Sequence, residues 1–165
     1  MRALLDSELV MQRLFSIAQA VNTPATPFQI MSRRFVHFKD VAPESMPAMY
    51  QFQSPIRKTD GGARGLPRQE IGVNWYVYLP KSTGPDDVVS PALNQYFDAL
   101  SQALLTTTFD SSGNPTVGAI PAGKQLQTLG GLVPGCYVDG PGLTDEGLLD
   151  TPSLIIIPIK ILTGM

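Results

Sequence analysis

Residues 70–79, EIGVNWYVYL, decide the fold predicted for this chain. Apolar side chains alternate with small, polar or tyrosine side chains; the apolar set is Ile71, Val73, Trp75, Val77 and Leu79, and the other set is Gly72, Asn74, Tyr76 and Tyr78. A period of two is typical of a strand that packs one face on a core. The stretch therefore predicts a sheet whose second, amphipathic face is able to meet water or a partner.

Four further stretches have strand character: 28–38 (FQIMSRRFVHF), 46–55 (MPAMYQFQSP), about 133–139 and 154–163. The last is apolar on both faces, which is typical of a strand buried on both sides. It also contains Pro158, which cannot donate to a ladder and so predicts an edge or a bulge. An apolar edge strand needs cover, either from a helix of this chain or from a neighbouring subunit.

Two stretches predict amphipathic helices. The first, about 6–20, has apolar residues at helical spacing and Asp6 or Ser7 as its cap. The second begins with Ser90 as cap and Pro91 at its first position, before a periodic apolar stripe. Two helices over one sheet can close a small core, so the 165 residues predict a single α+β domain over 1–165. Turn-rich stretches predict a long loop or hairpin tip at about 56–69 and a long loop at about 106–124.

The composition excludes several classes of protein. The 15 glycines and 15 prolines argue against a coiled coil, and 43% hydrophobic residues with a net charge of −2 argue against a disordered chain or a general nucleic-acid binder. A single cysteine, Cys136, excludes an intramolecular disulfide. The longest apolar run, 154–162, is too short to span a bilayer. We therefore expect a protein made in the cytosol, with no membrane contact.

The charge is unevenly distributed along the chain. Residues 1–81 contain 10 basic and 6 acidic groups, whereas residues 82–165 contain 2 basic and 8 acidic groups. Oppositely charged halves suit subunits that stack or form a ring head to tail. Chance scatter of charges over a solvated surface explains the same asymmetry. The charge distribution bears on how the protein associates and not on its fold.

Sequence patterns for catalysis or cofactor binding are missing. The one histidine, His37, lies in a predicted strand, and no G-x-S-x-G, H-E-x-x-H or phosphate-binding loop occurs. Acidic residues at 145, 146 and 150 have no calcium-loop spacing. We therefore expect no enzyme activity, no metal site and no cofactor.

Basic residues mark two candidate contact regions. The loop 57–68 contains Arg57, Lys58, Arg64 and Arg68, and it can contact nucleic acid backbone, contact an acidic partner surface, or be an ordinary solvated loop. The pair Arg33 and Arg34 lies in a predicted strand with one side chain on each face. Burying an unpaired arginine is costly, so this pair predicts an ion pair or an intersubunit contact.

The order of several segments resembles that of the tail terminator proteins of tailed bacteriophages. The segments are SRRFVHFKDV (32–41), MPAMYQFQ (46–53), IGVNWYVYLP (71–80), PALNQYFDALSQAL (91–104), LQTLGGLVPGCYVDG (126–140) and IIIPIKIL (155–162). The strongest single piece is QTLGGLV-x-x-CYVDG together with the upstream helix. None of these segments is a catalytic motif, so the resemblance rests on order and spacing.

The resemblance implies a structural role in a virion. Such proteins are α+β subunits with a mixed, mainly antiparallel sheet of about five strands and two flanking helices. They form a homohexameric ring at the head-proximal end of the tail tube, end its polymerisation and offer a docking face to the head connector. The implied partners are further copies of the chain, the tail tube protein and the head–tail connector protein. DNA only passes through the lumen, and the ring is assembled in the host cytoplasm.

Two groups of residues are candidates for these contacts. Contacts to tube or connector are expected in the two long loops, at Arg57, Lys58, Arg64, Arg68, Phe109, Val117, Ile120 and Lys124. Intersubunit or core packing is expected at Arg33, Arg34, Tyr76, Tyr78, Ile155, Ile157 and Ile159.

Three other functions stay open at this point. A head–tail joining or neck protein of the same virion would bind the connector rather than the tube. A small cytosolic ligand-binding or enzymatic domain would contain a pocket with convergent polar groups. A nucleic-acid-binding module would bind DNA in a strongly salt-dependent manner, which the net charge argues against.

Overall fold

A computed structural model describes residues 6–21, 26–59, 68–81, 90–118, 126–145 and 152–163 of the chain. Its helices are α1 (Ser7–Gln19), α2 (Ser90–Thr106) and two 3₁₀ helices, η1 (Phe38–Asp40) and η2 (Pro43–Ser45). Its strands are β1 (Ile30–Ser32), β2 (Ala48–Gln53), β3 (Arg57–Thr59), β4 (Arg68–Leu79), β5 (Thr107–Phe109), β6 (Pro115–Val117), β7 (Gly135–Val138), β8 (Leu143–Asp145) and β9 (Ser153–Thr163).

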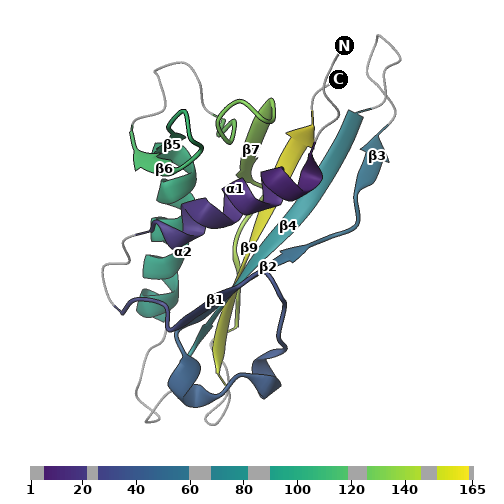
Figure 1. The fold of residues 1–165 in the computed structure, drawn as a ribbon. Helices are drawn as coiled ribbons and strands as arrows, with labels where there is room; N and C mark the ends of the chain where they lie inside the picture. Colours follow the sequence, from purple (N-terminus) through teal and green to yellow (C-terminus); the bar gives the residue numbers. More distant parts are fainter. Residues whose placement is uncertain are drawn as a thin grey trace.

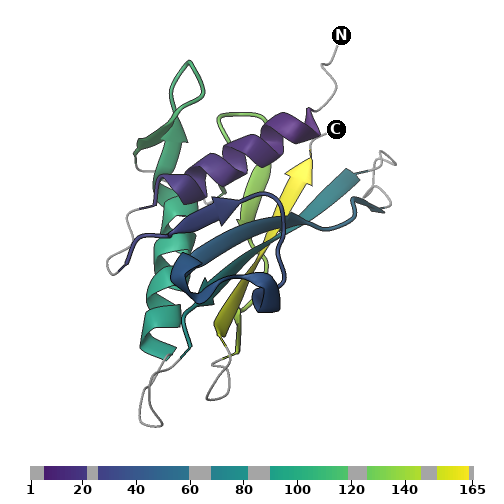
Figure 2. The ribbon, with the colours of Figure 1, turned by 60° about the horizontal axis from the view of Figure 1, so that its bottom comes forward.

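The main sheet has the strand order β1-β2-β4-β9-β7, with β3 beside β4 and β8 beside β9. The pairing of β1 with β2 is parallel, and the other pairings within this sheet are antiparallel. Both α1 and α2 pack on the same face of the main sheet (Figures 1 and 2). The predicted α+β fold, with a mixed and mainly antiparallel sheet and two flanking helices, is confirmed. The short strands β3 and β8 extend the predicted path of five strands.

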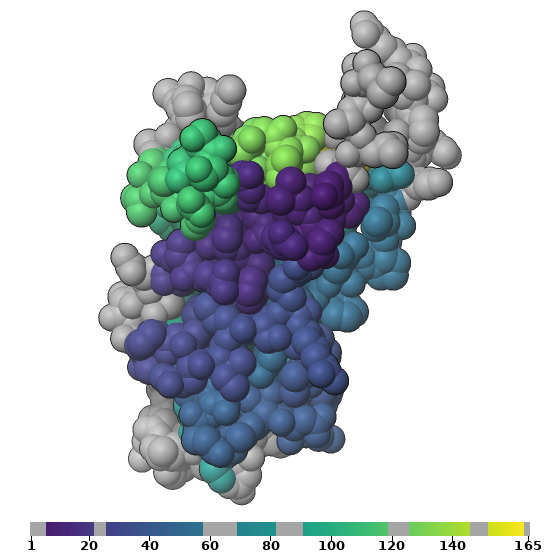
Figure 3. Space-filling view, viewed as in Figure 1, coloured from purple at the N-terminus to yellow at the C-terminus, as the bar shows by residue number. Residues whose placement is uncertain are grey.

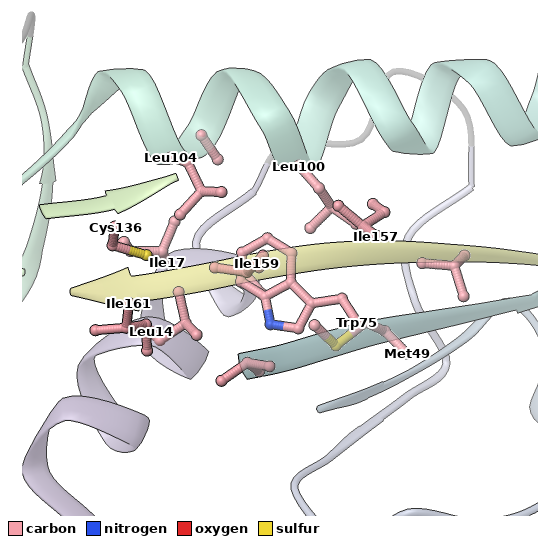
Figure 4. Close-up of a cluster of buried hydrophobic side chains, with 14 of the residues drawn as sticks. Leu14, Ile17, Met49, Trp75, Leu100, Leu104, Cys136, Ile157, Ile159 and Ile161 are labelled. Atoms are coloured by element: carbon pink, nitrogen blue, oxygen red, sulfur yellow. The ribbon is translucent and has the colours of Figure 1, made fainter. Parts of the chain in front are cut away.

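The core lies between the helices and one face of the sheet. The odd-numbered apolar residues of β4 and β9 are buried there with the apolar stripes of α1 and α2. Figure 4 shows Trp75 at the centre of this cluster, among side chains from both helices. Its indole Nε1 donates to Gln51 Oε1 at 3.0 Å, and Gln51 Nε2 donates to the Met11 carbonyl at 3.0 Å. The alternation in 70–79 therefore placed the core face of β4 correctly, because a buried face imposes that period.

The C-terminal strand β9 is central in the sheet, not at its edge. It pairs with β4 along its whole length and with β7 and β8 on the other side. The Pro158 carbonyl accepts from the Asp139 N–H at 2.8 Å, in the gap between β7 and β8. Because the N–H and C=O of one strand residue point to the same side, the missing donor of Pro158 faces that gap and the β4 ladder loses no bond. The cover for the inner face of β9 comes from this chain's own helices.

Two other expectations about local structure were wrong. The predicted strand 28–38 contains only β1; the chain then turns away, and His37 precedes η1 rather than lying in a strand. The predicted long loop 106–124 begins with a hairpin formed by β5 and β6. Its turn is stabilised by Asp110, whose carboxylate accepts from the N–H groups of Ser112 and Asn114. These bonds lower the pKa of Asp110.

Candidate interface on the outer face of the sheet

The face of the sheet opposite the helices is only partly covered. Segment 33–46 crosses it and packs on Tyr50 and Tyr78, forming a second buried cluster with Val41, Met46 and Ala48. The Tyr78 hydroxyl donates to the Val36 carbonyl at 3.1 Å, and burial raises its pKa. Tyr78, a candidate for intersubunit or core packing, is therefore a core residue of the single chain.

Next to the covered part, a group of apolar side chains on this face stays exposed, at Phe35, Phe52 and Leu143, or half-buried, at Tyr76 and Ile156. We call it the outer-face patch, and it consists of Phe35, Phe52, Tyr76, Leu143 and Ile156. The rings of Phe35 and Tyr76 lie 4.8 Å apart between centroids, and those of Phe35 and Phe52 lie 5.5 Å apart. The exposed fractions are 36% for Phe35, 41% for Phe52 and 62% for Leu143.

The strand register makes the outer-face patch continuous across the sheet. Tyr76 of β4 is opposite Ile156 of β9, and Ile156 is opposite Leu143 of β8. Directly opposed residues on one face of an antiparallel pair are in contact distance. Contiguous exposed apolar surface in a folded protein marks a site of interaction, so this patch is the candidate interface.

A compensated charge cluster lies on the same face beside the patch. Lys160 Nζ is 3.1 Å from Asp139 Oδ2 and 3.9 Å from Glu70 Oε2. The hydrogen bond to Asp139 raises the pKa of Lys160. Polar groups at the rim of an apolar patch are typical of protein–protein interfaces.

Arg33 and Arg34 lie after β1 and not within a strand. The ion pair predicted for this pair is present within the chain, because Arg33 donates to both carboxylate oxygens of Glu8 on α1. Arg34 is exposed, and its backbone N–H donates to Ser32 Oγ. Arg33 therefore connects the end of β1 to α1, and Arg34 stays on the surface.

The Arg33–Glu8 pair gives a test of local structure by titration. Hydrogen bonds from Arg33, then from Gln12, lower the pKa of Glu8 from 4.5 to about 2. Because the folded-state pKa is depressed, the pair stabilises the fold above the unfolded-state pKa, and this contribution is lost as the pH falls toward 2. In an NMR titration we expect a Glu8 midpoint near 2, which returns toward 4.5 in Arg33→Gln. A midpoint near 4.5 in the unmodified protein would contradict the pairing.

The other candidate residues are distributed over separate parts of the molecule. Ile155, Ile157 and Ile159 are buried in the core beneath the helices. The exposed Arg57 lies on β3, where Lys58 pairs with Gln69 of β4 and Thr59 with Arg68. Phe109 and Val117 lie at the ends of β5 and β6, and Val117 is 94% exposed. Figures 1 and 2 place this hairpin and β3 on different sides of the molecule. Arg64, Ile120 and Lys124 lie outside the described residues.

Gln127 is a buried polar residue that the sequence analysis did not single out. Its Nε2 donates to the Leu104 carbonyl at 3.0 Å and to the Thr107 carbonyl at 2.7 Å, and its Oε1 accepts from the Leu129 N–H at 2.9 Å. One amide thus joins the end of α2, the start of β5 and the turn at 129. The position of Gln127 within QTLGGLV gives no periodic signal, because its partners are at least 20 residues away or in an irregular turn.

Replacing Gln127 with methionine should lower the free energy of unfolding by about 3 kcal/mol, because two carbonyls and one N–H would be left buried without a partner. Urea unfolding followed by circular dichroism measures this difference. The exposed Gln102 on α2 offers the matched control Gln102→Met, for which we expect almost no change. Equal stability of the two variants would contradict the role given to Gln127.

The residues that the structure describes include no helix long and apolar enough to cross a membrane. Within the same residues, no group of three or more His, Cys, Asp or Glu side chains is placed to hold a metal ion. The one cysteine, Cys136, is buried in the core, and burial raises the pKa of its thiol to about 12. A scan against protein-family models and a search of curated proteins each returned no match to this chain.

Proposed function

We propose that this chain is the subunit of a ring at the head-proximal end of a bacteriophage tail tube. The ring ends polymerisation of the tube and offers a docking face to the head connector. The observation that carries the proposal is the outer-face patch, where Phe52 and Leu143 stay exposed after the chain has folded. The resemblance in the order of segments indicates which assembly to expect, a tail terminator ring. The outer-face patch offers the apolar surface that contacts between subunits would bury.

The distribution of charge in the fold supports contacts between unlike surfaces. Segment 26–59, which holds β1, β2 and β3, has five basic and two acidic residues. Segments 90–118 and 126–145, which hold α2 and β5–β8, have four acidic residues and no basic one. In the main sheet, β1, β2 and β3 lie on the β4 side of the central pair β4 and β9, and β7 and β8 lie on the β9 side. Complementary edges favour the head-to-tail contacts from which a closed ring is built.

Termination follows from the geometry of such a ring. One face of the ring pairs with the last layer of the tube in the way that the next layer would. The other face does not reproduce the growing end, so no further layer adds. Capping of this kind needs shape and surface chemistry alone, and each subunit contributes the same contact.

The test is polymerisation of purified tail tube protein in the presence of this chain. We expect that growth stops after its addition, that electron microscopy shows shorter tubes as the ratio of this chain to tube protein rises, and that the mass of the isolated protein is that of a ring. Unchanged tube length at saturating protein would count against capping. Binding to the connector protein with unaffected tube growth would favour a neck protein of the same virion instead.

A further inference from the structure

Arg13 of α1 is held in an unusual environment where three segments meet. Its guanidinium carbon lies 4.9 Å from the centroid of the Phe109 ring at the end of β5. Figure 3 shows α1, the β5–β6 hairpin and segment 126–138 side by side on one face of the molecule. Arg13 is half-buried there, between the turn of the hairpin and the turn that follows Gln127.

Two glycines make room for the guanidinium. A Cβ at Gly130 would lie 2.6 Å from Arg13 Nη1, and a Cβ at Gly113 would overlap Arg13 Nη2. Both glycines have positive φ, 72° at Gly130 and 85° at Gly113, which other residues rarely adopt. Each of the two turns therefore has a glycine at the point where it packs against Arg13. The guanidinium is enclosed by these two turns and the ring of Phe109.

The guanidinium of Arg13 makes no ion pair or hydrogen bond with any residue that the structure describes, and its contact there is with the ring of Phe109. Arg33, which also contacts α1, is by contrast paired with Glu8 through two hydrogen bonds. The Arg13 guanidinium lies over the Phe109 ring as a cation–π contact, and a guanidinium can bind a carboxylate through two parallel N–H bonds. The confined and unpaired Arg13 is thus organised for a planar anion.

We propose that Arg13, held on Phe109, is the docking site for an acidic side chain of a neighbouring copy of this chain. The inference rests on the proposed ring and names one of its subunit contacts. Asp40 in η1 and Glu44 in η2 are exposed carboxylates that make no ion pair with any residue in the described part of the chain. The 3₁₀ helices and the β5–β6 hairpin lie apart in Figures 1 and 2, so neither carboxylate is beside the hairpin of its own chain, and the pairing that we propose is with Arg13 of a neighbouring copy.

The experiment compares Arg13→Gln with Gln19→Glu by sedimentation over a range of protein concentrations. Both variants lower the net charge by one on the same helix, and Gln19 is exposed near its end. We expect Arg13→Gln to need at least about tenfold more protein for half-assembly, since truncating one partner of an interfacial charge pair is costly. Gln19→Glu should assemble as the unmodified protein does, and Arg13→Lys should be intermediate because it keeps the charge without the planar fork.

Hydrogen exchange of the hairpin amides in the unassembled protein shows whether Arg13→Gln merely releases β5 and β6 from α1. Weaker assembly with unchanged exchange supports the docking role, whereas weaker assembly that follows faster exchange assigns Arg13 to holding the hairpin and overturns it. Assembly of Arg13→Gln at the concentration of the unmodified protein overturns the docking role while the ring proposal stands. An unmodified protein that stays monomeric at high concentration overturns the ring proposal itself.

Discussion

Replacing Trp75 with alanine should lower the free energy of unfolding by about 3–5 kcal/mol, the range for removing a buried aromatic side chain. Trp75 is fully buried at the centre of the core, where side chains from both helices surround it (Figure 4). The substitution would also leave Gln51 Oε1 without its donor at a site that water does not reach. Since a domain of this size is stable by about 5–15 kcal/mol, the variant should unfold at far lower denaturant concentration.

Two further variants separate the causes of this loss. Trp75→Phe keeps most of the apolar volume and removes the indole N–H, so we expect about 1–3 kcal/mol of destabilisation from the unpaired Gln51 oxygen. Phe52→Ala removes a smaller aromatic side chain from the outer-face patch, where it is 41% exposed, and should change stability far less. A Trp75→Ala variant as stable as Phe52→Ala would show that the core lies elsewhere.

The parts of the fold that sequence alone predicted are those with a strong local period. The alternation in 70–79 fixes which residues of β4 face the core, because a shift by one residue would exchange every side chain between faces. The helices α1 and α2 were likewise predicted by their apolar stripes and start signals. Each of these signals is contained within one element, so neither partner nor position in the sheet is needed to interpret it.

The parts that sequence did not predict depend on distant segments. The place of β9 was misjudged because Pro158 excludes a ladder bond on one side only, and the sequence does not say which side lies against β4. Phe35–Phe38 continued the apolar pattern of β1 and predicted a longer strand, but these side chains pack on the outer face through segment 33–46. Arg33 was expected to need a carboxylate, yet its partner Glu8 lies 25 residues away on α1.

The candidate interface, the outer-face patch, also depends on distant segments of the chain. Sequence alternation predicted an amphipathic outer face on β4, with Tyr76 and Tyr78 on it. It could not show that segment 33–46 buries Tyr78 and leaves Tyr76 beside Phe35 and Phe52 at the uncovered part. Leu143 joins the patch only because β8 pairs with β9, and that pairing is not visible in the three residues of β8.

On the proposal that this chain forms a ring, replacing Phe52 and Leu143 together by serine should abolish assembly at the lowest concentration at which the unmodified protein assembles. Full burial of one large apolar side chain contributes about 1.5–3 kcal/mol, and association can bury only the part that the single chain leaves exposed, so losing both weakens a contact by roughly 1.5–3 kcal/mol. That corresponds to about tenfold to a hundredfold in the dissociation constant of one contact. The fold should tolerate the change, because both side chains are exposed in the single chain, 41% for Phe52 and 62% for Leu143.

The matched control is Leu105→Ser, since Leu105 is 50% exposed on α2 and lies outside the outer-face patch. Mass measurement of the three proteins at one concentration gives the comparison, and thermal unfolding of each checks that the fold is intact. Because the helices cover the inner face of the sheet, the outer-face patch is where a neighbouring subunit can bury apolar surface against β4, β8 and β9 together. Ring formation by the double variant, at the concentration that the unmodified protein requires, would show that subunits associate through another surface.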